Sequence, residues 1–245
     1  MTDRSLTPSS TTGRARRPAS ARSIRPPLER PAPLREGVYE AIVEMIITRE
    51  LQPGEHLAEK ELADHLGVSR QPVREALQRL QTEGWVDLRP ALGASVHIPT
   101  DAEADELLAV RTVLETESAR LAARRSTPEQ VEHLWELQRA GEKALSADDQ
   151  EGLVTTNAAL HGYVVSMSGN TVLAEFIALV ARRVRWYYLP IARARGKDAW
   201  DEHADLIEAI ASGNGRRAGD LMRRHTERTR ELYHERRQET AAAEA

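Results

Sequence analysis

Apolar residues recur with helical spacing along nearly the whole chain after residue 33, and this pattern limits the possible folds more than any other feature. Between Val38 and Ile46, apolar side chains stand at i, i+3, i+4, i+7 and i+8, which forms one stripe on a helix. Only the segments 85–89 and 94–98, on either side of Pro90 to Gly93, favour strands, and together they favour a β-hairpin. The sequence therefore predicts a mainly α protein.

Turn and capping residues divide the first part of this pattern into three helices. The first must end before Pro53-Gly54, the second covers about 59–66 and stops at Gly67, and Ser69 can cap a third that ends near Gly84. With the hairpin that follows, these elements make a small module over residues 34–98.

The rest of the chain is predicted to be helical throughout. Thr100 and Glu103 have the spacing of a capping box, and Pro190 should kink or split the longest segment. The expected helices are near 101–124, 128–145, 149–168, 171–195, 199–212 and 215–238. We expect an all-α antiparallel bundle over residues 101–238, followed by a short tail at 239–245.

The composition excludes several classes of site. The chain has no cysteine, so disulfides and thiolate metal sites are excluded, and a metal must be held by histidine and oxygen ligands. No stretch approaches the ~20 apolar residues of a membrane span, and the N-terminus lacks the apolar core of a signal peptide. We expect a cytoplasmic protein with no membrane partner.

The first 33 residues differ from everything that follows. They carry seven arginines against Asp3 and Glu29, and they are rich in Ser, Thr and Pro. With few large apolar residues, such a segment does not bury enough surface to offset its ordering entropy, which predicts a disordered basic arm. It is either a solvated leader or an arm that touches DNA phosphates.

The second and third predicted helices, with the turn at Gly67, form a helix-turn-helix. Arg70, Gln71, Arg74 and Gln78 stand opposite the apolar stripe of the third helix. Arginine and glutamine can pair bidentately with guanine and adenine in the major groove. Amphipathicity alone leaves the alternative that these are ordinary solvated side chains.

The segment from Leu57 to Trp85, and above all Ser-Arg-Gln-Pro-Val-Arg-Glu-Ala-Leu at 69–77, resembles the winged helix-turn-helix of the GntR superfamily of bacterial transcription regulators, in its FadR-like branch. Lys60 stands where some relatives have arginine, which favours a phosphate contact over a base contact. The DNA-contacting residues that the resemblance implies are Lys60, Ser69, Arg70, Gln71, Arg74 and Gly93.

Four polar residues in the second half form a possible ligand set. Asn157 and His161 are spaced i, i+4 and share one helical face, while His203 and His225 lie in the last two predicted helices. Each alone could be an ordinary surface residue. The other histidines have no such company and are interpreted as ordinary ones: His56, His65, His97, His133 and His234.

Residues 101–238 are similar to the FCD effector domain that accompanies this DNA-binding module. The pattern consists of Arg111-x3-Glu115, Asn157-x3-His161, Ser168-Gly-Asn170, Glu202-His203 with Ala209-Ile210, and His225. The resemblance implies a divalent metal, zinc or nickel, held by Asn157, His161, His203 and His225. Asn157 stands where aspartate is commoner. Arg111 either binds an acidic effector or forms a structural bridge to Glu115.

These features together predict a homodimeric transcription regulator, by family habit a repressor, that binds palindromic operator DNA and responds to a small carboxylate effector. Two alternatives remain open at this point. One is a metal-dependent enzyme that uses the three-histidine site, although no general base is positioned in the motif. The other is an architectural DNA-binding protein with a vestigial bundle.

Overall fold

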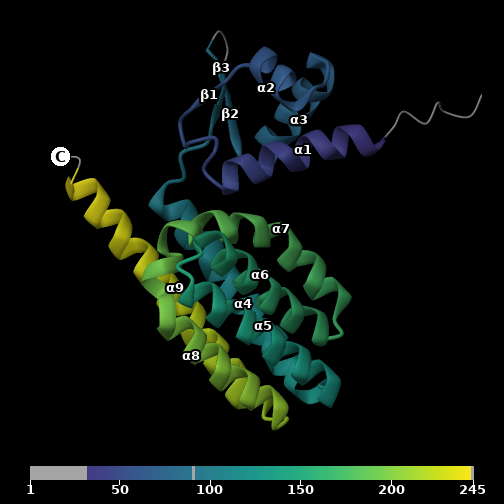
Figure 1. Cartoon of the computed structure of the whole chain (residues 1–245), viewed down its shortest axis with the longest axis vertical. Helices are drawn as coiled ribbons and strands as arrows, with labels where there is room; N and C mark the ends of the chain where they lie inside the picture. Colours follow the sequence, from purple (N-terminus) through teal and green to yellow (C-terminus); the bar gives the residue numbers. More distant parts are fainter. Residues whose placement is uncertain (1–31, 90–91, 244–245) are drawn as a thin grey trace, which may run out of the picture. The chain divides into compact units, whose positions relative to one another are not determined.

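The computed structural model describes residues 32–89 and 92–243 (Figure 1). The predicted basic arm, apart from residues 32 and 33, lies outside the described residues. The first described elements are α1 (Ala32–Ile47), α2 (Glu59–Leu66) and α3 (Arg70–Thr82). Their boundaries agree with those predicted. Gly67 ends α2 with φ 65°, the left-handed conformation that glycine adopts without strain.

The core of this module is formed by the apolar stripes of α1 and α3. Ile42, Ile46, Val73 and Leu80 are fully buried. Replacing such a side chain with alanine typically costs about 2–5 kcal/mol, so these positions hold the recognition helix in place.

The predicted hairpin is part of a three-stranded antiparallel sheet with the order β1-β3-β2. The hairpin strands are β2 (Val86–Arg89) and β3 (Gly93–Val96), and the added strand is β1 (His56–Leu57). Leu57 pairs with Ala94, and Leu88 pairs with Ala94 from the other side. A strand of two residues is too short to show an alternating pattern, so the sequence did not predict it.

The remaining helices pack side by side in an all-helical domain (Figure 1). Thr100 and Thr127 each form the reciprocal hydrogen bonds of a capping box at the starts of α4 and α5. The helices are α4 (Asp101–Arg125), α5 (Pro128–Ser146), α6 (Gln150–Met167), α7 (Thr171–Tyr188), α8 (Ala192–Ala211) and α9 (Gly215–Ala243).

Two predicted breaks are present. Pro190 divides the segment 171–195 as expected: because it has no N–H for the helical ladder, a 3-10 turn, η1 (Leu189–Ile191), lies between α7 and α8. Gly196, expected to separate two helices, has a non-helical backbone within α8, with φ 35° and ψ −130°. One boundary differs from the prediction, because α9 continues past residue 238 to Ala243. No helix in the described part of the chain is both long and apolar enough to cross a membrane.

Candidate DNA-binding face and buried histidine cluster

α3 exposes the polar side chains that the sequence assigned to DNA. Its apolar stripe is buried in the module, which leaves Arg70, Gln71 and Arg74 exposed. Ser69 precedes the helix with extended backbone but makes no capping hydrogen bond through its side chain. The predicted cap is thus correct in position and wrong in its hydrogen bond.

A single carboxylate, that of Glu59 at the start of α2, binds both arginines. Arg74 donates to it through Nε at 2.9 Å and Nη2 at 2.8 Å, and Arg70 donates through Nη2 at 2.9 Å. These hydrogen bonds, chiefly those from Arg74, lower the pKa of Glu59 to about 2. Sequence patterns did not connect these residues, because they stand 11 and 15 positions apart on different helices.

This arrangement keeps the two arginines extended and available. The side chains of Arg70 and Arg74 are 61% and 50% exposed, so water screens their attraction to Glu59. A guanidinium fork that binds a carboxylate has the geometry to bind a guanine edge or a phosphate instead. The ion pairs are therefore exchangeable.

The other predicted DNA contacts are exposed and have local partners. Lys60 lies 3.2 Å from the Asp64 carboxylate, one turn further along α2. The Gln71 amide donates to Glu75 at 2.9 Å in the same way on α3. Lys60 and Asp64 are both well exposed, and Glu75 also pairs with Arg35, so neither contact commits the predicted DNA-contacting side chain strongly.

Gly93 begins β3 next to the turn at the tip of the wing, with φ 84°. The positive φ favours glycine, and a Cβ atom at this position would lie 2.7 Å from Cε1 of the exposed His56 side chain, which would have to move. Gly93, Arg70 and Arg74 line one cavity of about 450 Å³. The recognition helix and the wing therefore contribute to one surface.

Three helices of the second domain bring His161, His203 and His225 together in its interior. All three are buried, and one ring nitrogen from each lies within 4.8 Å of the others. The Nε2 atoms of His203 and His225 are 3.3 Å apart. In the part of the chain that the structure describes, no other group of histidine and acidic side chains has this geometry.

The donor set fits a divalent metal. Burial lowers the pKa of His203 and of His225 well below the usual value, with further lowering from neighbouring cationic groups, so neutral imidazoles present free lone pairs. Asn157 lies one turn before His161 on α6, and its buried Oδ1 has no hydrogen-bond partner in the described structure. Three imidazole nitrogens and one amide oxygen suit zinc or nickel.

Two carboxylates orient His161 and His225 through the ring nitrogen that faces away from the proposed metal position. Nδ1 of His161 donates to Glu115 at 2.6 Å, and Nδ1 of His225 donates to Glu202 at 2.8 Å. Such bonds fix the imidazole tautomer and leave Nε2 for a metal. Glu202 is turned away from its neighbour His203, as expected on a helix, but sequence reasoning missed that it reaches His225 on α9.

Arg111 forms the predicted bridge to Glu115 and also borders the cluster. Its Nε donates to Glu115 at 2.9 Å, and its Nη2 lies 3.4 Å from both ring nitrogens of His161. Burial would raise the pKa of Glu115, but the charges of Arg111 and His161 outweigh this effect and hold it well below its usual range. The structural and ligand-facing interpretations of Arg111 are thus compatible.

One donor of Arg111 remains unused. Its buried Nη1 has no hydrogen-bond partner among the described residues. Arg111, Asn157 and His161 line a cavity of about 60 Å³, which Arg185 and Tyr188 of α7 also border. The cavity is therefore small, polar at one end and next to the histidines.

Comparison with known proteins agrees with this division of the chain. Residues 34–96 match the gntR family of bacterial regulatory proteins, and residues 106–228 match the FCD domain. The chain belongs to the GntR family. The GntR match covers the helix-turn-helix and the wing, and the FCD match covers Arg111 and all three clustered histidines.

Transcriptional regulators of other bacteria resemble this chain over more than half of its length. An uncharacterised helix-turn-helix regulator from an unstable DNA locus of Streptomyces ambofaciens is 30% identical over 199 residues, 78% of this chain and 81% of its own. The Nta operon regulator of Aminobacter aminovorans is 31% identical over 58% of this chain and 67% of its own. Escherichia coli McbR/YncC has the same fold, with a TM-score of 0.73 at 23% identity over 83% of this chain and 98% of its own.

This GntR-family protein is a DNA-binding transcriptional regulator with an FCD effector-binding domain, and it is not an enzyme. The alternative of a metal-dependent enzyme is therefore wrong. The three-histidine cluster belongs to a sensor domain.

Proposed function

We propose that this regulator binds a divalent metal at Asn157, His161, His203 and His225, and that a small carboxylate effector bound beside the metal controls operator binding. The observation that carries the proposal is the convergence of three buried histidines with the unused Nη1 of Arg111. A buried cation and a buried guanidinium together offset the desolvation of a carboxylate.

Different residues of the chain would orient the metal ligands and bind the effector. Glu115 and Glu202 hold two imidazoles in one tautomer. Arg111 Nη1 would donate to an effector oxygen in the cavity, whose size favours an acid of few carbon atoms. The metal, when bound, would supply a second positive contact for the carboxylate.

DNA binding is assigned to Lys60, Ser69, Arg70, Gln71, Arg74 and Gly93. Arg70 and Arg74 would exchange Glu59 for base edges or phosphates, and Lys60 would contact phosphate. We expect a regulator of chromosomal DNA to act in the cytoplasm. The effector can regulate only if it binds one placement of the DNA-binding domains more tightly than another. We propose that the protein without effector binds the operator and represses transcription.

The regulator would act as a homodimer on a palindromic operator, because helix-turn-helix proteins contact two half-sites with matching symmetry. Large apolar side chains are exposed along α4 and α7, which pack against each other. An exposed apolar surface of this kind fits a second copy of the chain. It is formed by Val110, Val113, Val172, Phe176 and Leu179.

Metal analysis tests the ligand set. The purified protein is expected to hold one divalent ion per chain, and His203→Ala is expected to lose it. His133→Ala is the matched control, since His133 is an exposed histidine paired with Glu136. Full metal occupancy in His203→Ala would remove that residue from the site.

The effector is tested by titrating small carboxylates into the metal-loaded protein on operator DNA. We expect one of them to change operator affinity, and Arg111→Lys to weaken that response because a lysine does not reproduce the guanidinium fork. Operator binding that ignores every carboxylate, with metal in place, would favour the architectural alternative.

A further inference from the structure

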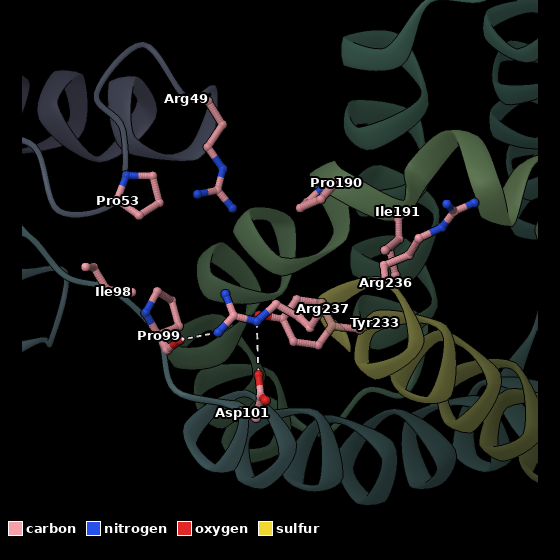
Figure 2. A pocket seen from close by; sticks show the side chains of 10 residues that line it. All are labelled: Arg49, Pro53, Ile98, Pro99, Asp101, Pro190, Ile191, Tyr233, Arg236 and Arg237. Atoms are coloured by element: carbon pink, nitrogen blue, oxygen red, sulfur yellow. Dashed lines mark hydrogen bonds and ion pairs between the residues drawn. The ribbon is translucent and has the colours of Figure 1, made fainter. Parts of the chain in front are cut away.

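A second cavity is lined by none of the residues of the histidine cluster. Its volume is about 330 Å³, and its walls come from the segment after α1, the connection into α4, the η1 turn and α9. Figure 2 shows Arg49 entering it from one side and Arg237 from the other, with Asp101 next to Arg237. None of these side chains belongs to the DNA-binding face or to the metal site.

Arg49 is a half-buried cation without a carboxylate partner among residues 32–89 and 92–243. Its guanidinium lies 5.3 Å from the centre of the Trp186 ring, which is a cation–π distance. Burial lowers the pKa of Arg49, and the neighbouring charge of Arg237 lowers it further. A buried cation of this kind is stabilised by an added anion.

The backbone of Arg49 is also unusual. Its φ of 65° is in the left-handed region, which glycine and asparagine adopt far more readily than arginine. Arg49 follows the end of α1, where a left-handed residue commonly terminates a helix, so glycine at this position should relieve local strain.

The opposite wall supplies further hydrogen-bond donors. Arg237 donates through Nε to Asp101 at 3.0 Å and through Nη2 to the Pro99 carbonyl at 3.2 Å, which fixes its orientation. Its Nη1 makes no hydrogen bond within the described residues. The hydroxyl of Tyr233, on the same wall, has no hydrogen-bond partner there either.

We propose that this cavity is a second ligand site, which binds a small oxyanion between Arg49 and Arg237. Arg49 and Arg237 face the single carboxylate of Asp101, and Arg236, which is paired with Glu239, also lines the cavity. The positive charge in the lining therefore exceeds the negative, and the guanidinium of Arg49 with Nη1 of Arg237 can donate to phosphate or carboxylate oxygens. The flanking Pro53, Ile98 and Pro190 would pack against a compact apolar body. The ligand class is a phosphorylated or carboxylated metabolite.

Such a ligand would join the two functional parts of the regulator. Arg49 follows a helix of the DNA-binding module, whereas Arg237 belongs to the last helix of the effector domain. An anion bound to both cations favours the arrangement seen here over any in which they separate, and this gives it a regulatory effect independent of the metal.

The test is calorimetric titration of the metal-loaded full-length protein with inorganic phosphate and, separately, malonate, at constant ionic strength. We expect saturable binding of at least one of these anions. Tighter binding of phosphate would indicate a phosphorylated ligand, and tighter binding of malonate a carboxylated one. Arg49→Gly is expected to weaken binding by at least about tenfold while leaving the thermal midpoint unchanged or higher, because it removes the charge and the strain together.

Two further variants separate this site from other anion binding. Arg223→Ala, which removes an exposed arginine of α9 paired with Glu227, should leave anion affinity unchanged. His203→Ala removes only anion binding that depends on the metal, so the binding that Arg49→Gly weakens should persist in it, which distinguishes this cavity from the metal site. Full affinity in Arg49→Gly, an equal loss in Arg223→Ala, or loss in His203→Ala of the binding that Arg49→Gly weakens would each overturn the proposal.

Discussion

Two arginine–glutamate pairs of nearly equal geometry lie in opposite surroundings. Nε of Arg74 lies 2.9 Å from Glu59, and Nε of Arg111 lies 2.9 Å from Glu115. The side chains of the first pair are 50% and 26% exposed, whereas those of the second are 2% and 6% exposed. The two pairs therefore have the same hydrogen-bond length and differ in their exposure to solvent.

Exposure decides what each pair can do. Water competes with the Arg74–Glu59 pair, so the pair contributes little to stability and opens easily for DNA. The Arg111–Glu115 pair cannot open without leaving an uncompensated charge in the core. One pair is thus suited to exchange partners, and the other to hold a binding group in a fixed position.

Breaking the buried pair should have the largest effect. Arg111→Met leaves the carboxylate of Glu115 buried with only His161 as a partner, and we expect the free energy of unfolding to fall by about 3–5 kcal/mol. Urea unfolding of the full chain, followed by tryptophan fluorescence, measures the change.

The double variant Arg111→Met with Glu115→Leu is the control. It removes both charges and fills the space with apolar atoms, so most of the lost stability should return. A loss below about 1 kcal/mol in the single variant would mean that the pair is solvated in solution, contrary to its burial.

Breaking the exposed pair should affect DNA binding and not stability. Arg74→Ala is expected to weaken operator binding by about 1–3 kcal/mol if the contact is bidentate to guanine, with an unchanged thermal midpoint. Fluorescence anisotropy with labelled operator measures the affinity. Arg139→Ala, an exposed arginine paired with Glu132 on α5, is the matched control and should bind operator normally. Equal affinities for both variants would remove Arg74 from the DNA-binding face.

The contrast also shows what sequence patterns can predict. Helical periodicity and capping residues gave most boundaries, including the Thr100–Glu103 box, because these signals are local. Asn157 and His161 were placed on one face by their spacing alone. Only the family resemblance joined them to His203 and His225, which the fold brings together from two other helices.

Partners from distant segments could not be predicted. Nothing local indicates that Glu59 binds two arginines of the next helix or that Glu202 supports His225, since these contacts depend on how helices pack. The strand β1 was missed for the related reason that two residues carry no periodicity. The left-handed Arg49 was also missed, because arginine is not a residue that signals a positive φ.

Removing the carboxylate of the exposed pair should have a smaller effect, of opposite sign. Glu59→Gln keeps the shape of the side chain but releases both arginines and removes a negative charge near the DNA phosphates. We expect affinity for DNA of any sequence to rise severalfold at low salt, with a smaller gain at high salt because the effect is electrostatic. Anisotropy titrations at two salt concentrations check this. Glu61→Gln, on the same helix, is the control. Affinity that falls in Glu59→Gln would show that Glu59 positions the arginines for DNA and does not compete with it.

A second exposed pair, which joins two helices of the effector domain, should give the smallest effect. Asp105 on α4 binds Arg230 and lies 2.8 Å from Nε2 of His234, both on α9, and its side chain is 39% exposed. The hydrogen bond from Arg230, followed by that from His234, lowers the pKa of Asp105 from 3.8 to about 2. Because the pKa is lower in the folded state, the stabilisation is fully present above about pH 4 and is lost as the pH falls toward 2.

Asp105→Asn should therefore lower the thermal midpoint slightly at pH 7 and make it less sensitive to acid between pH 4 and 2. Asp201→Asn, which changes an exposed aspartate paired within α8, is the control. An acid dependence of Asp105→Asn identical to that of the unmodified protein would show that the α4–α9 contact is no stronger than an ordinary surface pair.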